Sequence, residues 1–206
     1  MVLMGKVSDK RSDVLQAALE LIAERGFHDA PMAEIAEKAG VAAGTIYRYF
    51  ENKEVLITRL HQELEEEIST VLLKDYPIQR PLRERFLYLI RGLLRYFIAH
   101  PLHFRYMEQY MNSPYGISLH RDRVFGKSGR QEIIMEVFAT GVEHQVIKAL
   151  PKAVLFSLAF GPMLWLLRDH VMGFVVLEPF LIDQIAEACW DAIKTEPPQG
   201  VRCRPR

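Results

Sequence analysis

Between residues 31 and 54 the chain reads PMAEIAEKAGVAAGTIYRYFENKE, and it places Tyr47, Arg48 and Tyr49 directly after a run of small residues. Small side chains leave the backbone accessible, while phenol and guanidinium groups donate hydrogen bonds to anionic oxygens. Arg48 can also make a paired hydrogen bond to the edge of a guanine. This combination predicts a surface against which a polyanion can lie.

Two short helices must position this cluster. Periodicity predicts one helix from Pro31 to Gly40 and a second over about 43–49, joined by AGVAA. A glycine at the end of the first helix permits the turn of a helix-turn-helix unit, whose second helix enters a DNA groove. Plain helical packing remains the alternative, since paired aromatic residues often belong to a core. The residues expected to contact DNA are Ala42, Ala43, Gly44, Thr45, Tyr47, Arg48, Tyr49 and Lys53.

The rest of the chain follows the same helical period, and no stretch alternates as a strand would. Residues 75–81 and 112–116 are expected to be loops, and the Pro-rich end at 196–206 a disordered tail. The pattern therefore predicts an all-α protein of about nine helices. They are expected at about 9–25, 31–40, 43–49, 52–73, 82–99, 100–111, 130–139, 152–171 and 179–194.

Composition limits the possible functions. The 26 Lys and Arg residues balance 26 Asp and Glu residues, so total charge argues neither for nor against a nucleic acid partner. Cys189 and Cys203 are too few for a metal cluster or a disulfide framework, and Cys189 is expected in the core. The opening residues have no signal-peptide pattern. The apolar run at 153–167 is shorter than the ~20 residues of a membrane span, so we expect a cytoplasmic protein.

Catalytic and metal-binding motifs are not evident in the sequence. It contains no GxSxG, no phosphate loop and no nucleophile beside a base, so we expect neither an enzyme nor a cofactor. His100 and His103 could be two ligands of a metal ion. The sequence around them has no Cys or acidic residue at the spacing of a further ligand. We therefore expect no metal site.

The stretch IAEKAGVAAGTIYRYFENKEVL resembles the signature of the TetR family of bacterial repressors, and ALELIAERGF before it resembles the first helix of that family. The resemblance covers about residues 10–57. In one departure, Ala30 and Pro31 stand where many members carry a threonine or serine that touches phosphate. The positions that match are Ile35, Ala36, Ala39, Gly40, Val41, Gly44, Thr45, Tyr47, Tyr49, Phe50, Lys53, Glu54 and Leu56.

The resemblance implies an N-terminal helix-turn-helix DNA-binding domain of three helices at 1–55. It also implies a helical-bundle domain at 56–195 that binds a ligand and forms a homodimer through the helices at about 152–171 and 179–194. The protein would be a repressor that a small hydrophobic or aromatic effector releases from a palindromic operator. The aromatic and methionine-rich faces offer candidate ligand contacts, namely Phe86, Phe97, His103, Phe104, Met107, Tyr110, Met111, Phe156 and Trp165.

Alternatives remain open for the second half of the chain. Its last two helices can be ordinary core, and so can each of the candidate ligand contacts. The alternative function is that of a DNA-bound structural or adaptor protein whose C-terminal domain binds another protein. Such a protein would have DNA affinity that ignores small molecules.

Overall fold

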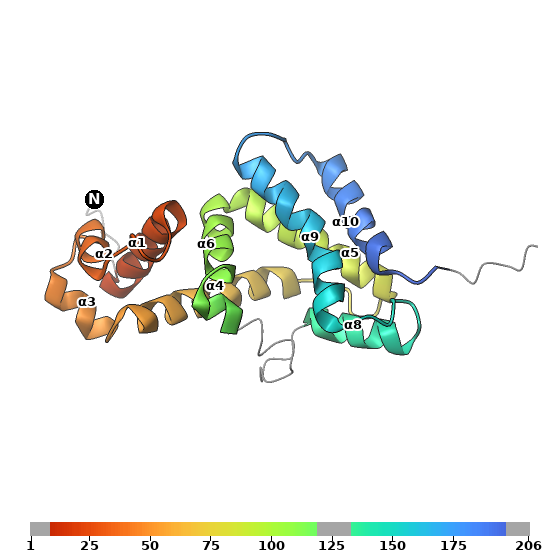
Figure 1. The fold of residues 1–206 in the computed structure, drawn as a ribbon, viewed down its shortest axis with the longest axis horizontal. Helices are drawn as coiled ribbons and strands as arrows, with labels where there is room; N and C mark the ends of the chain where they lie inside the picture. Colours follow the sequence, from red (N-terminus) through yellow and green to blue (C-terminus); the bar gives the residue numbers. More distant parts are fainter. Residues whose placement is uncertain (1–8, 119–132, 197–206) are drawn as a thin grey trace, which may run out of the picture. The chain divides into compact units, whose positions relative to one another are not determined.

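The computed structural model describes residues 9–118 and 133–196, which form helices joined by short connections (Figure 1). These residues include no strand, and an isolated antiparallel bridge joins Ile147 to Lys194. The predicted all-α fold class is therefore confirmed. Residues 130–132 of one predicted helix and 197–206 of the predicted tail lie outside the described residues.

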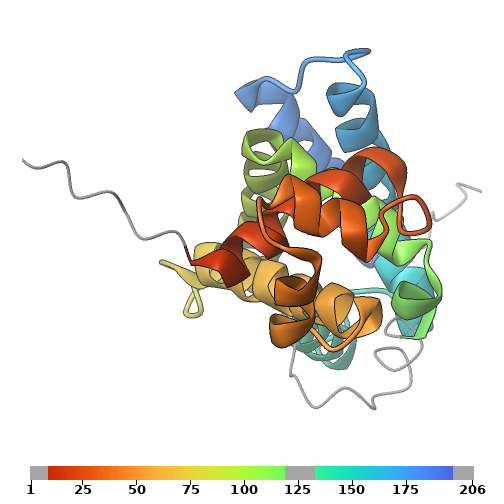
Figure 2. The ribbon, with the colours of Figure 1, turned by 90° about the vertical axis from the view of Figure 1, so that its left-hand side faces the viewer.

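The described residues divide into two compact units, of which unit 1 lies within Met1–Leu73 and Ala99–Arg121, and unit 2 within Lys74–Ile98 and Asp122–Arg206. Figure 2 shows the first three helices of unit 1 facing the viewer in red to orange. The helices of unit 1 are α1 (Lys10–Arg25), α2 (Met32–Lys38), α3 (Ala43–Tyr49), α4 (Lys53–Leu73) and α6 (Pro101–Met111). Those of unit 2 are α5 (Leu82–Ala99), α8 (Ile133–Glu143), α9 (Lys152–Val171) and α10 (Pro179–Ile193).

Local capping signals fix several of these helix ends. The Asp9 side chain accepts a hydrogen bond from the backbone nitrogen of Arg11 at 3.1 Å, and so caps α1. At the other end of α1, Gly26 adopts φ +81° and donates to the carbonyl of Ile22. The Asn52 side chain accepts from the nitrogen of Val55 at 2.9 Å and starts α4. These ends lie where the sequence predicts them.

Two connections differ from the sequence prediction. Helix α8 continues through residues 140–143, although the predicted helix ends at about residue 139. Residues 114–118 are helical although the prediction was a loop, because Ser113 caps them: its hydroxyl accepts from the nitrogen of Gly116 at 3.2 Å. Serine followed by proline is a common helix start, so the sequence does contain a signal for this short helix.

The core of unit 1 joins more helices than the predicted N-terminal domain contains. The buried faces of α1, α2, α3 and α4 pack with Tyr106 and Tyr110 of α6. On α4 the buried stripe includes Leu56, Leu60 and Leu64, well past the domain boundary predicted at residue 55. Each such side chain contributes about 1.5–3 kcal/mol through burial. The unit that holds α3 therefore also contains α4 and α6.

In unit 2, α9 and α10 lie side by side (Figure 1). The rings of Phe86 on α5 and Trp190 on α10 pack with their centres 5.5 Å apart. Arg85 is buried and donates to the Glu136 carboxylate at 2.8 Å and to the Tyr76 hydroxyl at 3.0 Å. The hydrogen bond to Glu136 raises the pKa of Arg85 above its usual value, so this link between α5 and α8 keeps its charge.

Candidate nucleic-acid interface

The α2–α3 turn has the geometry of a helix-turn-helix. Gly40 adopts φ +66°, a conformation that strains any residue with a side chain. The chain then turns back, and the nitrogen of Val41 donates to the carbonyl of Ala36 at 2.9 Å. Helix α3 begins two residues later. The predicted role of Gly40 in the turn agrees with this geometry.

Helix α3 separates a buried face from an exposed one. Ile46 is fully buried and Phe50 nearly so, and both belong to the core of unit 1. Tyr47 is 54% exposed and Tyr49 41%, values that are unusual for aromatic side chains with a core beside them. The predicted outward residues that are exposed here are Ala42, Ala43, Gly44, Tyr47, Arg48 and Tyr49, while Thr45 is half-buried.

Lys53, the last of the predicted DNA contacts, makes a contact within its own chain. Its ammonium group donates to the backbone carbonyl of Phe27, in the connection between α1 and α2, and the side chain is half-buried. Burial lowers the pKa of Lys53, and the charge of Asp29 partly opposes this shift. The lysine therefore ties the start of α4 to the end of α1.

Ion pairs brace the helices behind α3. Arg11 of α1 lies 2.5 Å from Glu63 of α4, and its guanidinium also lies over the ring of Phe50. Arg25 of α1 contacts Glu34 of α2 at 2.8 Å. Because these pairs are only partly shielded, each is worth under about 1 kcal/mol. They therefore add little to the apolar core that holds α1, α2 and α4 together.

The candidate ligand contacts are divided between the two units. In unit 1, Phe104 and Tyr110 are buried and Met107 packs against the core, whereas Met111 is 43% exposed. In unit 2, Phe86 and Phe97 are buried, and Phe156 packs on its helix neighbour with ring centres 4.6 Å apart.

Trp165, the last of the candidate ligand contacts, lies at the surface of α9. Its indole is 63% exposed, and the guanidinium of Arg168 lies over it at 4.7 Å. Helix α9 is apolar on nearly all sides, so hydrophobicity could not indicate which side faces inward. Val154 and Leu158 are exposed on the same helix. An apolar outer face of α9 therefore contains this tryptophan.

Helix α9 is also longer than the apolar run read from the sequence. It spans 20 residues with a mean hydropathy of 1.2 in its best window, only 28% of which is buried. By length and composition alone it could cross a membrane, but one such helix is weak evidence, because the core helix of a soluble protein meets the same requirement. Its Arg168 and Asp169 lie near one end, and its partner α10 covers part of its surface.

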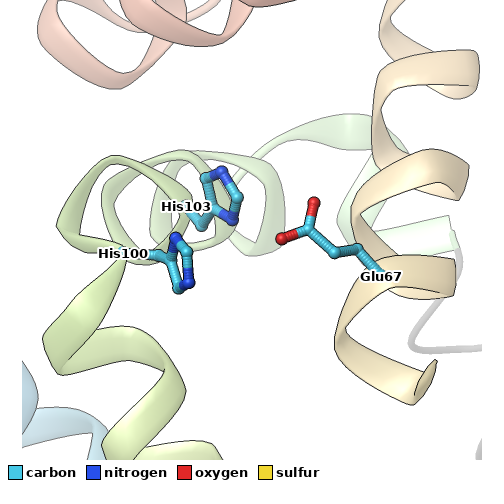
Figure 3. Close-up of side chains that lie close together, drawn as sticks. All are labelled: Glu67, His100 and His103. Atoms are coloured by element: carbon cyan, nitrogen blue, oxygen red, sulfur yellow. The ribbon is translucent and has the colours of Figure 1, made fainter. Parts of the chain in front are cut away.

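His100 and His103 lie next to a carboxylate that the sequence did not place near them. Figure 3 shows Glu67 of α4 directed towards both imidazoles, and one ligand atom from each residue lies within 4.8 Å of the others. The rings of His100 and His103 stack with centres 5.0 Å apart. The expectation of no acidic partner rested on spacing along the chain, and it fails because α4 packs beside the start of α6.

The fold and the exposed reader helix define a DNA-binding protein of the helix-turn-helix class. Residues 14–60 match the family described as bacterial regulatory proteins, tetR family. Residues 81–194, more than half of the chain, match the tetracyclin repressor-like C-terminal domain. The chain belongs to the TetR family of transcription regulators, which confirms the family resemblance of its N-terminal sequence.

Individual relatives agree with this placement. An uncharacterized HTH-type transcriptional regulator of Haemophilus influenzae is 24% identical over 91% of this chain and 97% of its own length. A fatty acid metabolism regulator protein of Bacillus subtilis is 45% identical, but over 60 residues only, so the chain spans 31% of that relative.

Solved structures are similar over nearly the whole chain. A TetR-family regulator from Marinobacter aquaeolei has a TM-score of 0.79 at 24% identity, covering 91% of this chain and 96% of that one. A putative TetR-family regulator from Vibrio parahaemolyticus is 32% identical with a TM-score of 0.71, covering 91% and 100%. These relatives are transcription regulators, not enzymes.

Proposed function

We propose that this protein is a cytoplasmic homodimeric repressor that binds a palindromic operator with α3 and is released by a small hydrophobic effector. The exposed tyrosine–arginine–tyrosine face of α3, above a buried Ile46, is the observation that carries the proposal. A reader helix of seven residues spans little more than one half-site. Two copies related by a two-fold axis therefore suit a palindromic sequence.

Contacts with DNA are expected from both polar and apolar parts of this face. The tyrosine hydroxyls can donate to phosphate while their rings cover sugar, and Arg48 can reach a phosphate or a guanine edge. The Lys53 ammonium group donates to the Phe27 carbonyl, and Arg48 is a cationic side chain on the exposed face of α3. We expect the logarithm of the affinity to fall with salt by about 0.9 per phosphate neutralised, and hence shallowly.

The dimer is proposed to form through α9 and α10. Val154, Leu158 and Trp165 are exposed along α9, and Gly161 between them leaves open space around its Cα. Residues spaced by three and four share one face of a helix. An apolar helix face of this length normally packs against a partner, and a small residue in its centre permits close approach of two helices.

The second domain is proposed to take up the effector. Its match to a tetracyclin repressor-like domain and its many buried aromatic rings support an apolar ligand. The similarity to the fatty acid metabolism regulator is confined to 60 residues, so it gives no indication of the effector. An effector releases the protein from DNA only if it binds more tightly to a conformation in which the reader helices cannot contact the operator. Near-complete switching requires a preference of about 10⁴-fold.

The dimer and the operator can be tested together. Gel shifts against genomic fragments, including the region upstream of the gene, should yield a specific band, and light scattering should give twice the chain mass. Leu158→Glu should yield monomers that bind DNA weakly. The matched control, Val71→Glu on the exposed side of α4, should remain dimeric. Absence of specific binding at low salt from every fragment would refute the operator proposal.

The effector requires a separate experiment. A screen of hydrophobic and aromatic metabolites should identify molecules that raise the melting temperature and lower operator affinity, and operator DNA should weaken effector binding by the same factor. Trp165→Phe leaves Trp190, buried against Phe86, as a single interior fluorophore. Operator affinity that no stabilising molecule changes would favour a DNA-bound adaptor instead.

A further inference from the structure

Three side chains with metal-binding atoms meet in unit 1, away from the exposed face of α3. Glu67 lies on α4, His100 immediately precedes α6, and His103 lies in the first turn of α6. One ligand atom of each lies within 4.8 Å of the other two (Figure 3). Three residues from two separate segments thus converge on one small volume.

We propose that Glu67, His100 and His103 bind one divalent transition-metal ion of the zinc class. Two imidazoles with one carboxylate form a ligand set that suits zinc with a further position left for water. Magnesium and calcium prefer oxygen ligands throughout, so they suit this set poorly. The site is independent of the operator and of the effector proposed above.

The present geometry lies close to what such an ion requires. A tetrahedral zinc ion with bonds of about 2.0–2.2 Å holds its ligand atoms roughly 3.3–3.5 Å apart, so the present separations must close by about 1.5 Å at most. Glu67 and His100 are exposed, while His103 is half-buried. We expect rotation of the two exposed side chains to close this distance.

The two imidazoles lie side by side at this site. The rings of His100 and His103 stack with their centres 5.0 Å apart. Each ring offers a nitrogen atom and Glu67 offers a carboxylate oxygen, all within 4.8 Å of one another. A cation between them would therefore meet two nitrogen ligands and one oxygen ligand.

A bound ion would connect α4 to α6. Another contact already joins the same helices, since the ring of His61 on α4 stacks on Tyr110 of α6 with centres 3.6 Å apart. Helix α4 starts four residues after the last residue of α3. The ion would therefore stabilise the unit that carries the reader helix.

Binding can be measured on the full chain without a polyhistidine tag, after dialysis against a chelator. Titration calorimetry with ZnCl₂ should give one site per chain, and Zn²⁺ should raise the melting temperature while Mg²⁺ does not. Co²⁺ should give visible absorption without the near-ultraviolet bands of thiolate ligation. Thiolate bands would assign the metal to a cysteine and overturn the proposal.

Variants then identify the ligands. Glu67→Gln and His100→Asn change exposed residues and should each weaken Zn²⁺ binding by at least about tenfold, while melting as the wild type does in chelator. The matched controls Glu66→Gln and His144→Asn, also exposed, should bind as the wild type does. Absence of stoichiometric binding, or equal binding by Glu67→Gln and Glu66→Gln, would overturn the proposal. Neither result would bear on operator recognition.

Discussion

Tyr47 and Ile46 are neighbours on α3. Truncation of Ile46 should mainly lower stability, and truncation of Tyr47 should mainly lower DNA affinity. Ile46 is completely buried, whereas Tyr47 is 54% exposed. Less than half of the tyrosine is shielded, so Tyr47→Ala should lower the free energy of unfolding by under about 1 kcal/mol. Ile46→Ala should lower it by about 2–5 kcal/mol, because it leaves a cavity in the core of unit 1.

Tyr47→Ala should instead have a large effect on DNA binding. A lost side-chain contact with DNA costs about 1–3 kcal/mol, and the proposed dimer would lose it at both half-sites, about 2–6 kcal/mol if the two sites act independently. Since 1.4 kcal/mol is a factor of ten, operator affinity should fall about 30-fold to 10⁴-fold in Tyr47→Ala. Tyr47→Phe should retain the part of this affinity that the ring supplies and lose the part due to the hydroxyl.

Fluorescence anisotropy with a labelled operator and thermal melting of the same samples separate the two effects. Affinity should be compared only at temperatures at which each variant is folded. A Tyr47→Ala variant that melts as early as Ile46→Ala would show that the ring is part of the core. Unchanged affinity in a stable Tyr47→Ala variant would remove Tyr47 from the DNA-binding surface.

Three further substitutions test single contacts. Lys53→Met should lower the free energy of unfolding by about 0.5–1.5 kcal/mol, because a partly buried carbonyl of the α1–α2 connection loses its donor. If Lys53→Met instead leaves stability unchanged and changes the slope of log affinity against log salt concentration by about one, Lys53 is a phosphate contact. Gly141→Ala should cost about 1–3 kcal/mol in chemical denaturation, since its Cβ would lie 2.4 Å from a side-chain carbon of Ile147. Gly44→Ala should cost less, because nothing lies within 4 Å of a Cβ added there. Equal losses of stability in the two variants would contradict a clash at residue 141. Burial raises the pKa of Cys189 from 9.0 to about 11, so the folded chain keeps a proton that the unfolded chain releases. The free energy of unfolding should therefore fall by about 2–3 kcal/mol as the pH rises from 9.0 to about 11. Cys189→Ala should remove that part of the fall, measured as the difference between the wild type and the variant in chemical denaturation over this pH range.

The helix ends were predictable because their signals are local. Asp9, Gly26 and Asn52 each act within a few residues of their own position, and all three lie where the sequence places them. The buried position of Cys189 was predictable for a similar reason, since it follows the apolar period of α10, and the prediction is confirmed. The outward direction of Tyr47 followed from Ile46 beside it, because one face of a short helix must enter the core.

The roles of the faces of α9 and α10 were not predictable in the same way. Trp165 was predicted as a ligand contact from its aromatic type alone, and its side chain is exposed in the structure. On α10, Ile185 and Cys189 pack inside their own chain while Ala188 is exposed, although all three follow one apolar stripe. When a helix is apolar on several sides, periodicity gives the helix but does not select the side that its own chain covers.

Contacts between α4 and α6 were invisible in the sequence for a different reason. Glu67 belongs to a run of glutamates that predicts a solvated face, and the two histidines that it approaches come 33 and 36 residues later. His61 interrupts an apolar stripe, yet it is buried against Tyr110. Only the packing of α6 onto the core of α1 and α4 brings these groups together. Since α4 follows α3 almost directly, the compact unit that carries α3 extends through α4 and α6, well beyond the helix-turn-helix that the signature marks.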